Sequence, residues 1–313
     1  MSGKDRASYL HGLLTNDIAS LEAGSGCYSA YLTPQGRMIS DLWVYELGDV
    51  ILVNLPSVAT KNTVLQKLDQ FIFSEDVQLA DVTGDFAQVA VVGPEAARVV
   101  ASLLNESVER LSSLREHGCL RGSVVGGAGI VARITDTGEP GFDLYVEQLR
   151  LNTLRETLAS LDVEEADADT VEVLRVEAGI PRFHADMNEE TIPLEAGIEL
   201  RAISMSKGCY VGQEVIIRVL HRGHGRVAKK LVGVTIDSAT VPSPAAVIKS
   251  GDREIGAVTS AVRSVALNTP IALGYVQRDF VEPGTAVSVD NANAVVTALP
   301  FAATDSSRSD RSR

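Results

Sequence analysis

Cysteine is scarce in this sequence, and its spacing excludes several kinds of site. Only three of the 313 residues are cysteine, namely Cys27, Cys119 and Cys209, and they form no CxxC pair. An odd number of distant thiols argues against a disulfide framework and against a zinc or iron–sulfur site made by this chain alone. We therefore expect a protein of the reducing cytoplasm that holds no metal of its own.

Long hydrophobic runs and an excess of positive charge are also absent. No apolar stretch approaches the roughly 18 residues that span a bilayer, and the first residues, MSGKDRASYL, lack the apolar core of a signal peptide. Lys and Arg number 28 against 41 Asp and Glu, which gives a net charge of −13. The sequence thus predicts no membrane segment, and its charge disfavours general binding of nucleic acids or anionic membranes.

The first part of the chain changes from a helical to a β pattern. Apolar residues at helical spacing over 10–18 predict a helix. A single apolar stripe predicts a second helix from about Ser57 to Phe73. The turn Thr33-Pro34-Gln35-Gly36 joins the first two of the intervening β-rich runs, so antiparallel pairing is expected. These runs cover residues 27–32, 38–47 and 50–55.

Two further parts follow, each with its own pattern. Between residues 81 and 161, a strand, a helix, further strands and an amphipathic helix predict an antiparallel sheet with helices on one face, as in ferredoxin-like domains. From about residue 227, short β-branched runs separated by turns predict a small β-barrel or sandwich. We therefore expect an α+β protein. Its expected parts are a discontinuous first domain at 1–80 plus 166–226, an insert at 81–165, a barrel domain at 227–302 and a disordered tail at 303–313.

The densest group of reactive residues is the motif KGCYVGQE at 207–214. Its two glycines let backbone N–H groups approach a ligand, while Gln213 and Glu214 offer the hydrogen-bonding groups that pair with the edge of a heterocycle. Lys207, or a helix that begins near the second glycine, would favour the thiolate form of Cys209. A Gly-rich turn around a small, buried Cys209 is the alternative explanation.

A basic stretch follows the motif directly. Residues 215–230 carry no acidic side chain, although the whole chain has a large acidic excess. Such a positive field suits a carboxylate, a phosphate or a stretch of RNA, while a charged strand edge that prevents aggregation is the alternative. His221 and His224 lie among these cations, which disfavours a zinc site. The basic residues are Arg218, Arg222, Arg226, Lys229 and Lys230.

Four segments of the chain together resemble a known family. KGCYVGQE, TNDI at 15–18, LTPQGRMISDLWV at 32–44 and VEAGIPRFHADMNEETIPLEAGIE at 176–199 are similar to the YgfZ-type folate-binding proteins, relatives of the glycine cleavage aminomethyltransferase, the T-protein. The resemblance covers nearly the whole chain. It implies a three-lobed, T-protein-like fold around a central hole in which tetrahydrofolate binds.

The resemblance also implies roles for single residues. Asp41 matches an acid near the folate nitrogens, although Ser40 stands where T-proteins have a second acid. Glu195 matches a glutamate that hydrogen-bonds the pterin ring, and Arg226 an arginine suited to the glutamyl carboxylate. From the residues alone, Asp41 and Glu195 are equally well explained as polar surface residues. The candidate catalytic residues are Cys209 and Asp41, and the candidate cofactor-binding residues are Asp41, Glu177, Phe183, Glu195, Lys207, Gln213, Glu214 and Arg226.

Three functions are consistent with this pattern. The leading hypothesis is a tetrahydrofolate-binding accessory protein that assists assembly or repair of iron–sulfur clusters in client enzymes, with Cys209 as its functional thiol. The alternative is a folate-dependent aminomethyltransferase or demethylase of the T-protein type, which Ser40 and Cys209 disfavour. An RNA-binding module is a third hypothesis, based on the basic stretch, and the net charge argues against it. The expected partners are therefore folate and iron–sulfur client enzymes or assembly factors.

Overall fold

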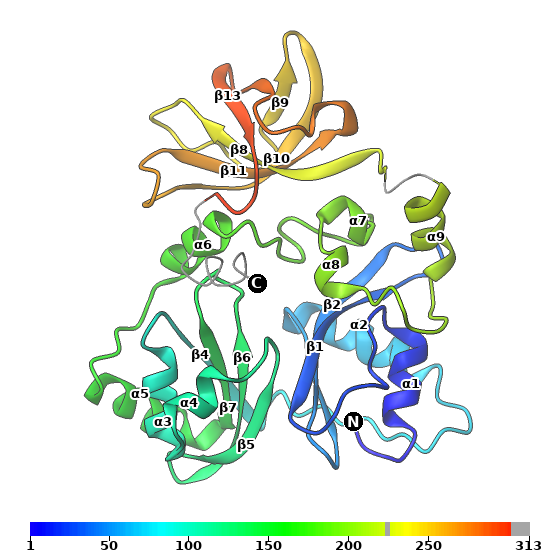
Figure 1. Cartoon of the computed structure of the whole chain (residues 1–313), viewed down its shortest axis with the longest axis vertical. Helices are drawn as coiled ribbons and strands as arrows, with labels where there is room; N and C mark the ends of the chain where they lie inside the picture. Colours follow the sequence, from blue (N-terminus) through cyan, green and yellow to red (C-terminus); the bar gives the residue numbers. More distant parts are fainter. Residues whose placement is uncertain (223–225, 302–313) are drawn as a thin grey trace.

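Three lobes make up the described part of the protein (Figure 1). The structure is a computed structural model, and it describes residues 1–222 and 226–301. The predicted tail at 303–313, His224 and the side chains of His221 and Arg222 lie outside the described part. Within the described ranges, no helix is long and apolar enough to cross a bilayer.

The first lobe contains a three-stranded antiparallel sheet and two helices. Leu42 and Val44 pack with the helices in one apolar cluster. Because successive side chains of a strand point to opposite faces, Asp41, Trp43 and Tyr45 lie on the face turned away from those helices. The elements of this lobe are α1 (Arg6–Leu13), β1 (Ser25–Leu32), β2 (Met38–Glu46), β3 (Ile51–Asn54) and α2 (Val58–Asp69).

Both helices of this lobe are shorter than their apolar spacing predicts. Helix α1 ends at Leu13, so the fully buried Ile18 lies beyond it. Helix α2 ends at Asp69, and Phe71 and Phe73 are 44% and 83% exposed. The predicted helix ends were wrong because they were placed at the last apolar residue with helical spacing. Such a residue can also lie in the non-helical chain that follows a helix, where it is either buried or exposed.

The second lobe has an antiparallel sheet in the order β4-β7-β6-β5, with helices against one face. Phe142, Leu144 and Val146 pack with residues of α3 and α5 on that face. Tyr145 belongs to a different cluster, shared with Tyr45 of the first lobe. The predicted sheet with helices on one face is therefore present. Its elements are β4 (Phe86–Val92), α3 (Ala96–Leu104), α4 (Val108–Ser112), β5 (Cys119–Val124), β6 (Gly127–Ile134), β7 (Gly141–Glu147), η1 (Gln148–Arg150) and α5 (Leu151–Ser160).

Beyond α5 the chain returns to the first lobe through short helices. Phe183, Met187 and Tyr210 pack with Tyr28 and other β1 residues in one cluster. The later part of the segment therefore completes the core of the first lobe, on the face of the sheet opposite to α1 and α2, whereas Val173 and Val176 of its first helix pack with barrel residues. Its elements are α6 (Ala168–Glu177), α7 (Pro193–Ala196), α8 (Glu199–Ala202), α9 (Gln213–Ile217) and the π-helical η2 (Arg218–Arg222).

The third lobe is a closed six-stranded barrel in the order β10-β11-β8-β13-β12-β9. The residue pattern alone left a barrel and a sandwich open, and the predicted C-terminal barrel is confirmed. A buried ionic group attaches it to the return segment, because Asp186 accepts hydrogen bonds from Arg175 Nη1 at 2.6 Å and from Thr259 Oγ1 of the barrel at 2.5 Å. The barrel elements are β8 (Lys229–Ile236), β9 (Val247–Ser250), β10 (Arg253–Arg263), β11 (Pro270–Gln277), η3 (Arg278–Phe280), β12 (Ala286–Val289) and β13 (Ala292–Thr297).

Candidate functional site

Asp41 is the best placed of the predicted site residues. It lies on β2, is only 3% exposed, and its Oδ2 accepts a hydrogen bond from Tyr28 Oη at 2.8 Å. Its Oδ1 is buried and has no hydrogen-bond partner among the described residues. A buried carboxylate oxygen without a donor is costly, which is the condition expected where a ligand supplies the donor. Asp41 is thus a deep acceptor rather than a polar residue on a solvent-facing strand.

In its surroundings, the carboxyl group of Asp41 binds its proton more tightly than an exposed carboxyl group does. Burial is the main cause that raises its pKa to about 6, and the nearby charge of Asp136 makes a smaller contribution in the same direction. The hydrogen bonds from Tyr28 and from its own backbone, together with the charge of His184, act in the opposite direction. The carboxyl group therefore changes its charge about two pH units closer to neutrality than an exposed aspartate does.

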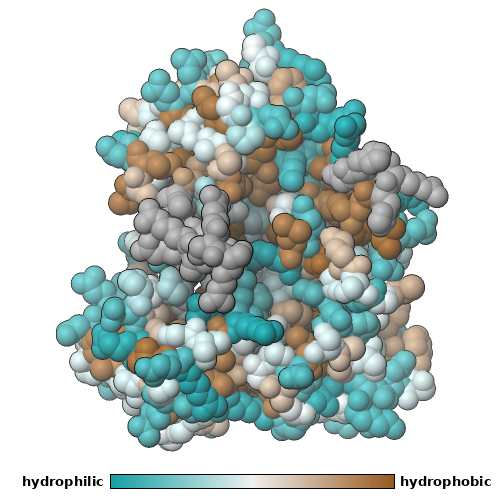
Figure 2. Space-filling model, in the orientation of Figure 1, coloured by the Kyte–Doolittle hydropathy of each residue, from teal (hydrophilic) through white to brown (hydrophobic). Residues whose placement is uncertain are grey.

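Arg201 connects this acid to the second lobe. From α8, its Nη2 donates to Glu116 Oε1 at 3.2 Å and to Asp136 Oδ1 at 3.3 Å. Its guanidinium also lies over the ring of Tyr28, 5.3 Å from the ring centre. The site around Asp41 is thus built by side chains from two lobes. Figure 2 shows the surface hollowed near the middle of this face, where the lobes meet.

A second buried acid lies on the sheet of the second lobe. Asp143, on β7, accepts from Gln88 Nε2 at 2.7 Å and from Tyr145 Oη at 3.4 Å. Burial raises its pKa to about 7, and Asp136 adds to this increase. The indole nitrogen of Trp43 is also buried without a partner in the described structure. Together with Asp41 Oδ1, it leaves unsatisfied polar atoms on the β2 face that is turned away from α1 and α2.

Sequence reasoning found Asp41 but missed its neighbours. Tyr28 and Asp143 each lie inside an apolar run that predicts a strand. The carboxylate of Asp143 within the run FDLYV was the one available indication that a polar group is buried on that strand. Asp136 and Arg201 carried no such sign. Their importance depends on the meeting of two lobes, which a single sequence does not reveal.

The motif KGCYVGQE lies elsewhere, and Lys207 is not positioned as expected. Its ammonium group donates to the backbone oxygens of His11 at 2.5 Å, Leu14 at 2.6 Å and Asn16 at 3.0 Å, at the C-terminal end of α1. Burial lowers its pKa to about 8. Because three carbonyls already occupy this cation, the predicted support of a Cys209 thiolate by Lys207 does not fit the geometry. Lys207 instead caps α1.

The remaining motif residues lie at the surface. Cys209 is exposed, which rules out the alternative of a small buried cysteine. Gln213 Nε2 reaches Gly208 O at 3.5 Å, and Glu214 pairs with Arg218 at 2.8 Å while remaining 86% exposed. The helix expected after the second glycine is α9, which has only five residues. The structure therefore does not bring this group into contact with Asp41.

The other candidates take up separate positions. Glu177 Oε1 accepts from Ser264 Oγ at 2.6 Å and from the Ala266 backbone, so it fastens the barrel. Phe183 is buried in the core of the first lobe, with its ring 4.6 Å from that of His184. Arg226 is exposed.

Glu195 is the one remaining candidate that is both buried and close to cations. It lies on α7, which packs on β8, and is 8% exposed. Burial raises its pKa, and the charges of Lys229 and Arg37 oppose that increase. Lys229 in turn lies over the ring of Tyr275, 4.7 Å from its centre. This mixed-charge group at the junction with the barrel is separate from the Asp41 group.

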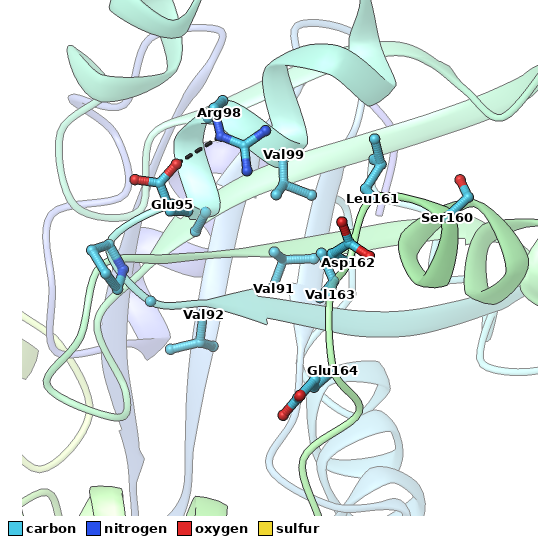
Figure 3. A pocket seen from close by; sticks show the side chains of 13 residues that line it. Val91, Val92, Glu95, Arg98, Val99, Ser160, Leu161, Asp162, Val163 and Glu164 are labelled. Carbon is cyan, nitrogen blue, oxygen red and sulfur yellow. Dashed lines mark hydrogen bonds and ion pairs between the residues drawn. The ribbon is translucent and has the colours of Figure 1, made fainter.

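Two cavities occur away from these residues. One of about 600 Å³ opens beside α3, where Arg98 pairs with Glu95 at its rim (Figure 3). A smaller one of about 180 Å³ lies between β2, α2 and His184. Neither is lined by the predicted site residues. Within residues 1–222 and 226–301, no three His, Cys, Asp or Glu side chains are grouped to hold a metal ion.

Comparison with known proteins places the chain in a family. Residues 1–207 match the GCVT N-terminal domain, and residues 229–302 match the glycine cleavage T-protein C-terminal barrel domain. The chain therefore belongs to the glycine cleavage T-protein family. Tetrahydrofolate is the one-carbon carrier of this family.

Curated relatives agree over almost the whole length. An aminomethyltransferase of Saccharopolyspora erythraea is 31% identical over 311 residues, covering 96% of this chain and 83% of the relative. An aminomethyltransferase of Nostoc is 29% identical, with 96% and 81% covered. The crystal structure of glycine cleavage system aminomethyltransferase T from Bartonella henselae has the same fold, with a TM-score of 0.85, 23% identity and 96% and 82% covered. The predicted relationship to the T-protein is thus confirmed, whereas the YgfZ-type branch is not shown. The relatives' names favour the alternative activity over the iron–sulfur one.

Proposed function

We propose that this protein binds tetrahydrofolate at Asp41 and uses it in one-carbon transfer of the aminomethyltransferase type. The observation that carries this proposal is the buried Oδ1 of Asp41, for which residues 1–222 and 226–301 provide no hydrogen-bond partner. A reduced pteridine carries several N–H groups, and a carboxylate is the acceptor that suits them. When bound, tetrahydrofolate supplies nitrogens that accept a one-carbon unit.

The chain's own residues fit that role. Asp41 holds or releases a proton near neutral pH, while Tyr28 keeps its other oxygen fixed. Ser40 does not replace the second acid of the T-proteins, because its Oγ donates to the Asp41 backbone carbonyl at 2.6 Å. Asp41 is therefore the one acid of that pair available for proton exchange. Glu195, beside Lys229 and Arg37, is proposed as a second contact, for a different end of the ligand.

Calorimetric titration with tetrahydrofolate tests the binding step. We expect saturable binding by the wild type and a loss of at least about tenfold in affinity for Asp41→Asn, which is the value of one charge-assisted hydrogen bond. Asp237→Asn, at an exposed position on the barrel, is the matched control and should bind like the wild type. Equal affinity in all three proteins would remove Asp41 from the binding site.

A turnover assay tests the transfer step. Purified protein is supplied with tetrahydrofolate and an aminomethylated thiol donor, and ammonia release is measured. Release that requires both the protein and Asp41 supports a transferase. Folate binding without release would contradict the transfer step and leave the binding step intact.

A second candidate function rests on Cys209. Desolvation raises the pKa of the half-buried Cys27 to about 12 and that of the buried Cys119 to about 11, whereas Cys209 is exposed. We propose, as the alternative, that this thiol serves a folate-binding accessory protein in assembly or repair of iron–sulfur clusters in client enzymes. A Cys209→Ser variant should then reduce client activity in cells while leaving folate affinity unchanged. Full client activity in that variant would eliminate this candidate.

A further inference from the structure

Two neighbouring side chains, Asn16 and Thr15, connect β1 and α8 beside Asp41. Asn16 Nδ2 donates to the backbone oxygen of Tyr28 at 2.8 Å and to that of Arg201 at 3.1 Å. The neighbouring Thr15 Oγ1 donates to Ala202 O at 2.6 Å. Strand β1 and helix α8 are therefore fixed relative to each other where Tyr28 and Arg201 stack.

The second lobe supplies the charges that meet this arginine. Glu116 and Asp136 both lie in that lobe, and each places an oxygen within 3.3 Å of Arg201 Nη2. Arg201 is 30% exposed and Asp136 is 31% exposed at the side chain, so the pair is partly screened from water. One guanidinium thus joins the two lobes at the edge of the Asp41 site.

We infer that Arg201 is a positioning residue for Asp41: by pairing with Asp136 and packing on Tyr28, it sets the charge that Asp41 presents to a ligand. Asp136 is a negative neighbour of Asp41, and Arg201 offsets that charge. Tyr28 is the donor to Asp41, and Arg201 lies on its ring. The inference rests on the proposed role of Asp41 in folate binding.

The signs of the expected effects follow from the groups that face Asp41. These are Tyr28 from β1, Asp136 from the second lobe and His184 from the return segment. Removing the charge of Asp136 should lower the pKa of Asp41, because a like charge disappears and Arg201 is left less compensated. Removing the charge of Arg201 should raise it, because Asp136 is then uncompensated. If Arg201 had only a structural role, the two substitutions would not shift the pKa of Asp41 in opposite directions.

The test is an NMR titration of the Asp41 carboxyl carbon in protein labelled at aspartate, without ligand. The Asp41 signal is assigned by its loss in Asp41→Asn. We expect the midpoint to fall by about 0.5 pH unit or more in Asp136→Asn and to rise by a similar amount in Arg201→Gln. The double variant should return to within about 0.3 pH unit of the wild type, because the two charges leave together.

Arg121→Gln is the matched control for these variants. Arg121 also joins the two lobes by an ion pair, with Asp49 at 2.5 Å, but it contacts neither Tyr28 nor Asp136. Its removal should leave the Asp41 midpoint unchanged. Shifts of the same sign in Asp136→Asn and Arg201→Gln, or equal shifts in Arg121→Gln, would overturn the inference.

Two further measurements keep the inference testable. If Arg201→Gln does not fold, Asp136→Asn decides alone, and a midpoint that does not fall contradicts the inference. The pH at which tetrahydrofolate affinity changes should shift with the NMR midpoint in each variant. Absence of folate binding would count against the proposed function, whereas the ligand-free titration would still decide the role of Arg201.

Discussion

Replacing Asp41 by Asn should stabilise the ligand-free protein while weakening its ligand binding. Asp41 has a pKa raised from 3.8 to about 6 by burial, so the native state binds this proton more tightly than the unfolded chain does. The stability contributed by this group therefore decreases as the pH rises from about 4 to about 6. A shift of one pKa unit corresponds to about 1.4 kcal/mol of free energy. Compared with an aspartate of unshifted pKa, Asp41 therefore lowers the free energy of unfolding by about 3 kcal/mol at pH 7.5 and by about 1 kcal/mol at pH 4.5.

Urea unfolding followed by tryptophan fluorescence measures this difference. Trp43 is the single tryptophan of the chain and lies two residues from Asp41 on β2, so its signal reports the first lobe. We expect Asp41→Asn to be more stable than the wild type by about 3 kcal/mol at pH 7.5, with the advantage falling to about 1 kcal/mol at pH 4.5. A destabilised variant at pH 7.5, or an equal difference at both pH values, would refute this reasoning.

Three other variants or reagents test separate parts of the structure. Lys207→Met should lower the free energy of unfolding by about 2–3 kcal/mol, because three carbonyls at the end of α1 lose their cation; urea unfolding measures it. Asp186→Asn should cost about 3–5 kcal/mol in the same assay, because Arg175 is left buried with less compensation. A thiol reagent at pH 8 should modify the exposed Cys209 rapidly, and the half-buried Cys27 and the buried Cys119 slowly; three equal rates would contradict these differences in exposure.

The sequence predicted most of the strands because their patterns are local. Antiparallel pairing of β1 and β2 follows from two β-rich runs on either side of a Pro-Gly turn, and the register of Tyr28 opposite Trp43 agrees with it. The closed barrel was harder to predict, because barrel and sandwich share the same short alternating runs. Helix ends were missed where buried apolar residues such as Ile18 follow the last helical turn.

A residue of the site could be predicted only where a sequence motif identifies that residue by itself. Asp41 could be found by its match to a family motif. Arg201 and Asp136 could not, because they lie 65 residues apart and meet only after the two lobes close on each other. Lys207 was given the wrong neighbour for a similar reason: its ammonium group bonds to α1, almost 200 residues earlier in the chain, and proximity in sequence to Cys209 suggested otherwise.

A crystal structure of the protein with tetrahydrofolate tests the central claim most directly. The account predicts a ligand N–H group within hydrogen-bond distance of Asp41 Oδ1, with Tyr28 still donating to Oδ2. Folate bound elsewhere, with Asp41 Oδ1 still lacking a partner, would contradict it.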